Sequence, residues 1–176
     1  MNRKTGNQGM TIIELLVVLV VVGIISSMGI PAFQKMLERH RLKEAAESFK
    51  SDVLFARTEA LKQSRNVAIS RTSGNNGAWC YGLRANDASC DCAQTTTSAT
   101  DYCDLKRVLG ADFNQTNLDA GGTNNNQVDF RRGTIANNGV TFSTANYSAR
   151  VVFSQVGRVR ICTPTGTLGL PEFPDC

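Results

Sequence analysis

Hydrophobic and polar residues follow three different patterns along this chain, and the first is an apolar run. Between Met10 and Ile30, 21 residues carry one ionisable side chain, Glu14. At about 1.5 Å of rise per residue, a helix of this length spans a hydrocarbon core of roughly 30 Å. The basic residues Arg3 and Lys4 precede it, which favours a cytoplasmic N-terminus. The pattern predicts a transmembrane helix over 10–30.

Two ordinary segments compete with this interpretation. A secretory signal peptide has a shorter apolar run of about 7–15 residues and a small-residue cleavage site, whereas Met28-Gly29-Ile30-Pro31 fits such a site poorly. A plain membrane anchor fits the length but leaves Glu14 unexplained. A carboxylate inside an apolar span costs on the order of a few kcal/mol unless it has a partner. Glu14 is therefore expected to have a function.

The second pattern is an amphipathic helix over 31–65. Pro31 is expected to kink or loosen the helix where this segment begins. Apolar residues then recur at spacings of three and four, with polar residues between them. They are Leu42, Ala45, Ala46, Phe49, Val53, Ala56 and Ala60. The helix should end near Ser64 and needs a sheet to cover its apolar stripe.

The third pattern is a series of short alternating runs over 66–176, which predicts a β-rich head and hence an α+β fold. The predicted strands are Val67–Arg71, Ala78–Arg84, Leu105–Leu109, Gln127–Arg131, Gly139–Ser143, Ala149–Ser154 and Arg158–Cys162. The last two strands should be joined by a tight turn at Gln155-Val156-Gly157. The segments Ala85–Thr100 and Asn114–Asn126 are predicted to be loops.

Six cysteines lie beyond the apolar run, and an even count in an exported domain predicts up to three disulfides. They are Cys80, Cys90, Cys92, Cys103, Cys162 and Cys176. Cys162 with Cys176 would close the C-terminal tail, and the other four would staple the central loop. Cys90 and Cys92 are too close to bond each other, so each should pair outward. Their spacing also differs from the C-x₂-C of zinc sites, so no metal is predicted.

The positive charge of the chain is local. The formal net charge is +4, and two of these charges, Arg3 and Lys4, lie in the N-terminal leader. Between Phe130 and Leu170 there are five arginines and no acidic residue. They are Arg131, Arg132, Arg150, Arg158 and Arg160.

The N-terminus resembles the class III signal sequence of the type IV pilin superfamily. A basic leader ends in Gly9, Met10 follows, and Glu14 is the fifth residue after that boundary. The resemblance implies that a prepilin peptidase removes residues 1–9 and methylates the new N-terminus at Met10, where members commonly carry Phe. Glu14 of a neighbouring subunit would then neutralise that amino group within an apolar helix bundle.

Three further segments resemble the GspH/FimT group of minor pilins and pseudopilins, most closely its FimT branch. They are Phe55–Leu61 with Val67–Ile69, Asp129–Gly133, and Gly157–Cys162. The resemblance implies a long helix packed on antiparallel sheets, in a low-abundance subunit at or near a filament tip. Its partners would be major and minor pilins. Before assembly it would lie in the bacterial inner membrane with its head in the periplasm, and afterwards in a pilus at the cell surface.

In the FimT branch, a Gly-Arg-x-Arg motif is associated with binding DNA in natural transformation, and Gly157-Arg158-Val159-Arg160 is similar to it. Residues two apart on a strand share a face and lie about 7 Å apart, so Arg158 and Arg160 could clamp successive phosphates. Arg150 on the neighbouring strand would extend the patch, and Arg131 and Arg132 are candidates from another strand. Such binding to double-stranded DNA would be independent of sequence and sensitive to salt.

Other interpretations of these arginines remain. They could form a solvated strand face, or contact acidic residues of a neighbouring subunit such as Asp87, Asp101 and Asp112. The protein would then be a structural minor pilin or type II secretion pseudopilin that primes assembly, or an adhesive variant of one, without DNA binding. Within the motif, Gly157 also suits a hairpin and Val159 a core.

The sequence does not favour an enzyme. His40 is the only histidine and lies among charged residues of the helix. No carboxylate pair stands out, and Gly74-Asn75-Asn76-Gly77 lacks the lysine and helix of a phosphate-binding loop. No catalytic residue and no cofactor is predicted.

Overall fold

A computed structural model describes residues 10–121 and 124–176, so the predicted leader 1–9, with Gly9, lies outside the described residues. Helix α1 (Ile12–Gln63) precedes a series of short strands. These are β1 (Val67–Thr72), β2 (Cys80–Arg84), β3 (Lys106–Leu109), β4 (Asn117–Asp119), β5 (Asn125–Val128), β6 (Asn138–Ser143), β7 (Ser148–Phe153) and β8 (Val159–Cys162), with a 3₁₀ helix η1 (Gly110–Phe113) after β3. The chain divides into two compact units, Met1–Leu37 and Glu38–Cys176.

The first unit contains the N-terminal part of α1. Its apolar side chains are exposed, Met10 by 69% and Ile12 by 83%. By length and composition, α1 is apolar enough to cross a membrane. The helix continues through residue 31 without interruption, so the loosening expected at Pro31 does not break it. Prolines are tolerated within membrane-spanning helices because surrounding groups can satisfy the freed carbonyl.

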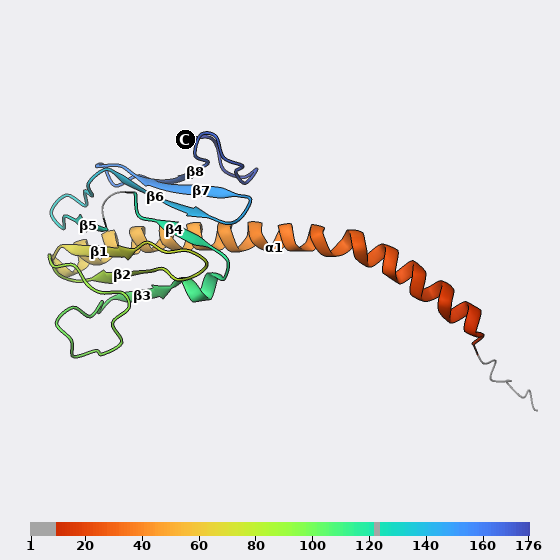
Figure 1. The fold of residues 1–176 in the computed structure, drawn as a ribbon. Helices are drawn as coiled ribbons and strands as arrows, with labels where there is room; N and C mark the ends of the chain where they lie inside the picture. The colour runs from red at the N-terminus through yellow and green to blue at the C-terminus, as the bar shows by residue number, and fades with distance from the viewer. Residues whose placement is uncertain (1–9, 122–123) are drawn as a thin grey trace, which may run out of the picture. The chain divides into compact units, whose positions relative to one another are not determined.

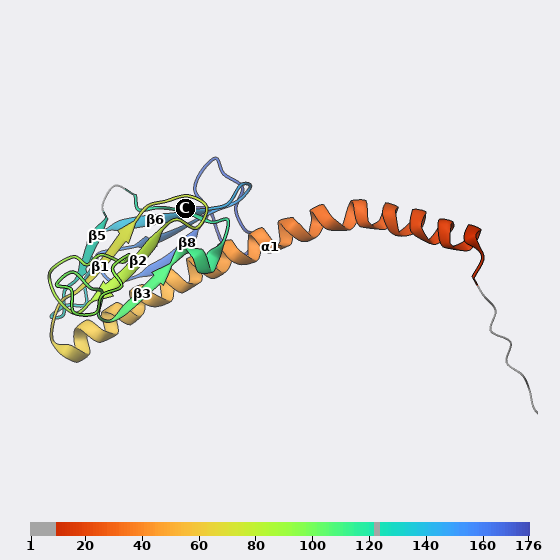
Figure 2. The same ribbon diagram turned by 60° about the horizontal axis from the view of Figure 1, so that its bottom comes forward.

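The second unit, the head, places two four-stranded antiparallel sheets beside the later turns of α1 (Figures 1 and 2). The strand order is β3-β2-β1-β5 in the first sheet and β4-β6-β7-β8 in the second. Consecutive strands pair within each sheet, for example Ile69 of β1 with Leu83 of β2 and Val140 of β6 with Val151 of β7. The α+β architecture predicted from the sequence is confirmed.

The core of the head forms between α1 and both sheets. Every residue of the predicted apolar stripe is buried, from Leu42 to Ala60. Phe49 lies at the centre: its ring is 5.0 Å from that of Tyr81 on β2, 5.8 Å from that of Phe142 on β6 and 6.5 Å from that of Phe153 on β7. One helical side chain therefore contacts aromatic rings from both sheets, which fixes all three layers against one another.

The sequence prediction was wrong in the segment Asn114–Asn126, which is not a simple loop. It contains β4 and the start of β5. These strands are rich in Asn and Asp, which are poor strand formers, and they form because Leu118 pairs with Phe142 and Asn126 with Ile69. Tertiary pairing thus overrides local propensity here.

The predicted strand Gln127–Arg131 was also placed too late, because β5 ends at Val128. The chain then turns: Gly133, with a φ of +61°, donates its N–H to the carbonyl of Asp129 at 2.7 Å. Arg131 and Arg132 are therefore exposed turn residues and not strand residues. The glycine explains the turn, since it adopts positive φ without the Cβ penalty.

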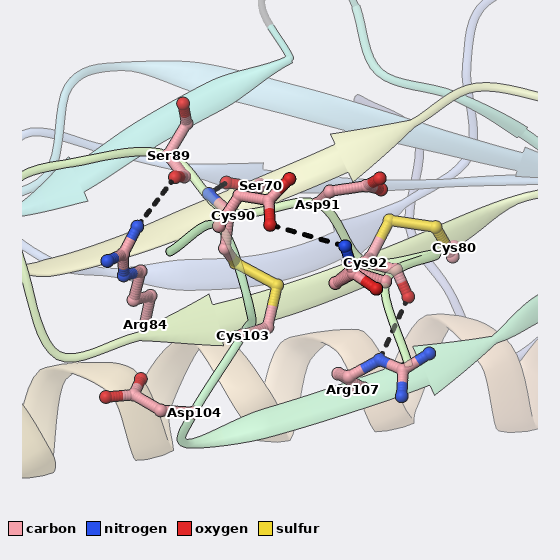
Figure 3. Close-up of a disulfide and its surroundings, with 12 residues drawn as sticks. Ser70, Cys80, Arg84, Ser89, Cys90, Asp91, Cys92, Cys103, Asp104 and Arg107 are labelled. Atoms are coloured by element: carbon pink, nitrogen blue, oxygen red, sulfur yellow. Dashed lines mark hydrogen bonds between the residues drawn. A yellow bond between two sulfur atoms is a disulfide. The ribbon is translucent and has the colours of Figure 1, made fainter. Parts of the chain in front are cut away.

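All six cysteines form disulfides, as predicted, and the structure gives their pairing. Cys80 bonds Cys92, Cys90 bonds Cys103, and Cys162 bonds Cys176. Figure 3 shows the first two beside each other, where they hold the long β2–β3 loop against the first sheet. The Cys90 N–H donates to the Ser70 hydroxyl at 2.9 Å. Cys90 and Cys92 are thus unavailable as zinc ligands.

Three charged side chains are buried among the described residues of the head, and all have partners; Glu59 accepts from Lys62 and Gln63 of its own helix. Asp52 accepts hydrogen bonds from the Tyr81 hydroxyl at 2.8 Å and from Lys106 at 2.5 Å, and burial raises the pKa of Tyr81. Arg71 donates to Asn126 and lies 5.7 Å from the Phe153 ring. Burial lowers the pKa of Arg71 to about 10. Buried polar groups with fixed partners restrict the core to one arrangement.

We expect the tail disulfide to stabilise the head. A Cys162→Ser/Cys176→Ser variant opens a loop with a sequence separation of 14, and closing a loop of this size stabilises a fold by about 3 kcal/mol. Urea denaturation of the full chain in detergent, followed by fluorescence of the buried Trp79, would measure the free energy of unfolding. An unchanged midpoint would contradict this role.

Candidate nucleic-acid interface

The outer face of the second sheet carries three of the five predicted arginines. Along β7, Ala149, Val151 and Phe153 are buried, so the alternate residues point away from the core. Arg160 of β8 pairs with Val152 of β7, which places Arg160 on that same outer face. Arg158 precedes the first residue of β8, and both it and Arg160 are exposed.

Arg158 and Arg160 line one open hollow of about 300 Å³, as the sequence predicted for a shared face. Its other lining residues are Val152, Ser154 and Val156. The turn is held by two backbone hydrogen bonds, from Gly157 to the Ser154 carbonyl at 2.8 Å and from Ser154 to the Arg158 carbonyl at 3.0 Å. Among the ion pairs of the described residues, none involves either arginine. Both guanidinium groups can therefore meet an external anion.

Arg150 shares this face but points elsewhere. It pairs with Cys162 of β8 on one side and Thr141 of β6 on the other. The Arg150 guanidinium lies over Gly139 of β6. If Gly139 carried a Cβ atom, that atom would be only 2.6 Å from the Arg150 Nε. Because β6 and β8 flank β7 on opposite sides, Arg150 extends the positive surface away from the hollow and does not line it.

Arg131 and Arg132 lie in a turn that contacts the turn of the arginine motif. A Cβ on Gly157 would be 2.9 Å from the Gly133 carbonyl oxygen, which places the two turns against each other. Asp129 fixes this turn by accepting the N–H groups of Arg131 at 2.7 Å and Arg132 at 3.3 Å. Both arginines therefore belong to the same end of the head as Arg158.

The sequence has no acidic residue between Phe130 and Leu170, but an acidic residue from the tail lies beside this segment in the fold. Asp175 forms a parallel bridge with Thr163, directly after β8, because the Cys162–Cys176 disulfide brings the tail back to that strand. The hollow lies at the other end of β8, toward the turn. The positive potential should therefore be strongest around Arg158 and should weaken toward the tail.

A residue without a predicted role, Arg57 of α1, connects the two turns. Its Nη1 donates to the Gly157 carbonyl at 3.4 Å. A Cβ on Gly157 would be 2.8 Å from the Arg57 Cζ, and one on Gly133 would be 2.8 Å from its Nε. The guanidinium thus lies between two glycines of positive φ, +77° and +61°. The three segments that resemble the GspH/FimT group meet at this point.

This arrangement separates two roles within Gly157-Arg158-Val159-Arg160. Gly157 and Val159 serve the fold, since Gly157 makes room for Arg57 and Val159 packs against the core. Arg158 and Arg160 face solvent. The sequence did not reveal the part played by Val152, Ser154 and Val156, because which residues flank an arginine depends on the strand register.

We expect Gly157→Ala to destabilise the head more than Gly166→Ala. Both glycines have a similar φ, +77° and +80°, but among the described residues other than its two chain neighbours, no heavy atom lies within 4 Å of the Cβ position at Gly166. Each variant should lose about 1 kcal/mol from left-handed backbone strain. Gly157→Ala should lose about 1–3 kcal/mol more, because it displaces Arg57. Urea denaturation of both variants measures the difference, and equal losses would show that Arg57 packing is unimportant.

Comparisons with known proteins agree with this fold. The family model described as type II transport protein GspH matches residues 45–157, and the model of the prokaryotic N-terminal methylation motif matches residues 4–30. The GspH match ends at Gly157, so Arg158 and Arg160 lie beyond it. A search of curated proteins finds no significant match.

Two crystal structures of the type IV minor pilin FimU from Pseudomonas aeruginosa are similar to the chain, each at 16% sequence identity. The first covers 72% of this chain and 91% of FimU with a TM-score of 0.52, and the second covers 68% and 91% with a TM-score of 0.49. At this identity the first likeness shows the fold, a long helix packed on antiparallel sheets. Because the GspH model matches more than half of the residues of this chain, the chain belongs to the GspH family, within the type IV pilin superfamily.

Proposed function

We propose that this protein is a minor type IV pilin that binds double-stranded DNA, independently of sequence, for uptake in natural transformation. The observation that carries the proposal is the hollow where Arg158 and Arg160 are exposed together without an ion-pair partner among the described residues. Their spacing, about 7 Å for residues two apart on a strand, is similar to that of successive phosphates on one DNA strand.

The proposed contacts are to phosphate groups, which carry no sequence information. Arg158 and Arg160 would bind neighbouring phosphates, while Arg131, Arg132 and Arg150 would add longer-range attraction from the surrounding surface. Gly157 would contribute through the turn, which sets the position of Arg158. Each phosphate contact releases counterions, so binding should weaken steeply with salt.

The first unit supports a filament role. We propose that prepilin peptidase cleaves after Gly9 in the inner membrane, with the head in the periplasm, and that the methylated Met10 becomes the N-terminus. Glu14 is exposed on α1, and in a filament it would pair with the Met10 amino group of an adjacent pilin. Major and minor pilins would then surround the apolar helix, with this subunit at or near the pilus tip on the cell surface.

A second candidate function is that of a structural minor pilin or type II secretion pseudopilin that primes assembly without DNA. The name of the matched family, type II transport protein GspH, favours it. Exposed apolar residues near the end of α1 also fit contact with another subunit: Leu54, Phe55 and Leu61 are 41%, 40% and 52% exposed. Measurement of DNA binding separates the two candidates.

We expect an Arg158→Gln/Arg160→Gln variant to lose about tenfold or more of its affinity for a short duplex DNA. The slope of log affinity against log salt concentration should become shallower by about two, one for each lost phosphate contact. Fluorescence anisotropy of labelled duplex with the full chain in detergent, over a series of salt concentrations, would measure both quantities.

The matched control is Arg41→Gln/Arg65→Gln, which removes two positive charges that do not line the hollow, one on α1 and one just after its end. It should bind DNA nearly as well as the natural chain. Equal loss in both variants would indicate a general charge effect. Equal binding by the natural chain and the Arg158/Arg160 variant would overturn the proposed site and leave the structural role as the better account.

A further inference from the structure

An exposed apolar residue lies at the tip of the β7–β8 turn. Val156 is 75% exposed, the highest exposure among the large apolar residues of the head. It lines the same hollow as Arg158 and Arg160, together with Val152. Pure phosphate binding needs cations and gives no reason for apolar side chains in the site.

The strand register arranges the hollow in two rows. Arg160 lies opposite Val152, and the hydrogen bond between Ser154 and the Arg158 carbonyl places those two residues opposite each other. One row is therefore Arg158 and Arg160, and the other is Val152 and Ser154. Val156 lies beyond Ser154, in the turn that joins the two rows. Neighbouring strands are about 4.8 Å apart, and the repeat along each row is about 7 Å. The two arginines thus lie beside two apolar side chains in the hollow, Val152 on β7 and Val156 in the turn.

A DNA strand also places anionic groups next to apolar ones. Phosphates alternate with deoxyriboses, so sugar C–H groups flank each pair of neighbouring phosphates. We infer that Val152 and Val156 contact the deoxyriboses of the strand whose phosphates bind Arg158 and Arg160. Val156 is then a specificity-determining residue, which distinguishes the sugar–phosphate backbone from polyanions that lack a sugar.

This inference rests on the proposed function, and its energetic basis is the removal of apolar surface from water. Polyphosphate offers the arginines the same charges but has no C–H groups to cover the valines. The natural chain should therefore prefer duplex DNA to linear polyphosphate at matched charge. Partial burial of one valine side chain corresponds to about a fivefold difference in affinity.

The test compares Val156→Asn with Val156→Ile in the full chain in detergent. Asparagine suits the turn but is polar, whereas isoleucine keeps the apolar surface. Val156→Asn should lose about fivefold in affinity for duplex DNA and keep its affinity for polyphosphate. Val156→Ile should bind both probes like the natural chain. Leu168→Asn, at a site 68% exposed and outside the hollow, controls for loss of an exposed apolar residue.

The outcomes separate this inference from the function on which it rests. If the natural chain binds DNA and Val156→Asn keeps the same ratio of DNA to polyphosphate affinity, the sugar contact is wrong while the arginine site stands. If Val156→Asn loses affinity for both probes equally, the residue acts on the turn and the inference is overturned. If the natural chain binds neither probe, the proposed function fails and the inference fails with it.

Discussion

The packing of Phe49 against both sheets is the interaction on which the rest of the head depends. Its ring contacts Tyr81 in the first sheet and Phe142 and Phe153 in the second. Neither sheet alone covers the apolar stripe of α1. Because Phe153 is the last residue of β7, the same packing fixes where the β7–β8 turn begins, and so where Arg158 and Arg160 emerge. The core thereby determines the position of the exposed site.

The sequence was sufficient for the parts of the fold that follow from periodicity. The stripe from Leu42 to Ala60 and the hairpin turn at Gln155-Val156-Gly157 were both predicted, because each shows its own local pattern. The strand β4 and the start of β5 were not predicted, since their Asn-rich segments form strands only through pairing with distant partners. The disulfide pairing was also beyond the sequence, because it depends on which loops lie side by side.

The candidate site was predictable to a similar degree. A two-residue spacing on a strand was enough to place Arg158 and Arg160 on one surface. The direction of Arg150 was not predictable, because it depends on the gap left by Gly139 in a neighbouring strand. Arg57 stood out only as a motif residue, and its contact with Gly133 and Gly157 explains why these three separated segments occur together. The motif therefore combines a packing requirement with an exposed pair of charges.

The most direct test of the central claim is hydrogen–deuterium exchange of the full chain in detergent, with and without duplex DNA. The account predicts slower exchange in the β7–β8 turn and the first residues of β8, with a smaller effect in the turn that contains Arg131 and Arg132. Protection confined to another surface, such as the disulfide-bonded loop between β2 and β3, would contradict it. Unchanged exchange throughout the head, under conditions where DNA is bound, would contradict it as well.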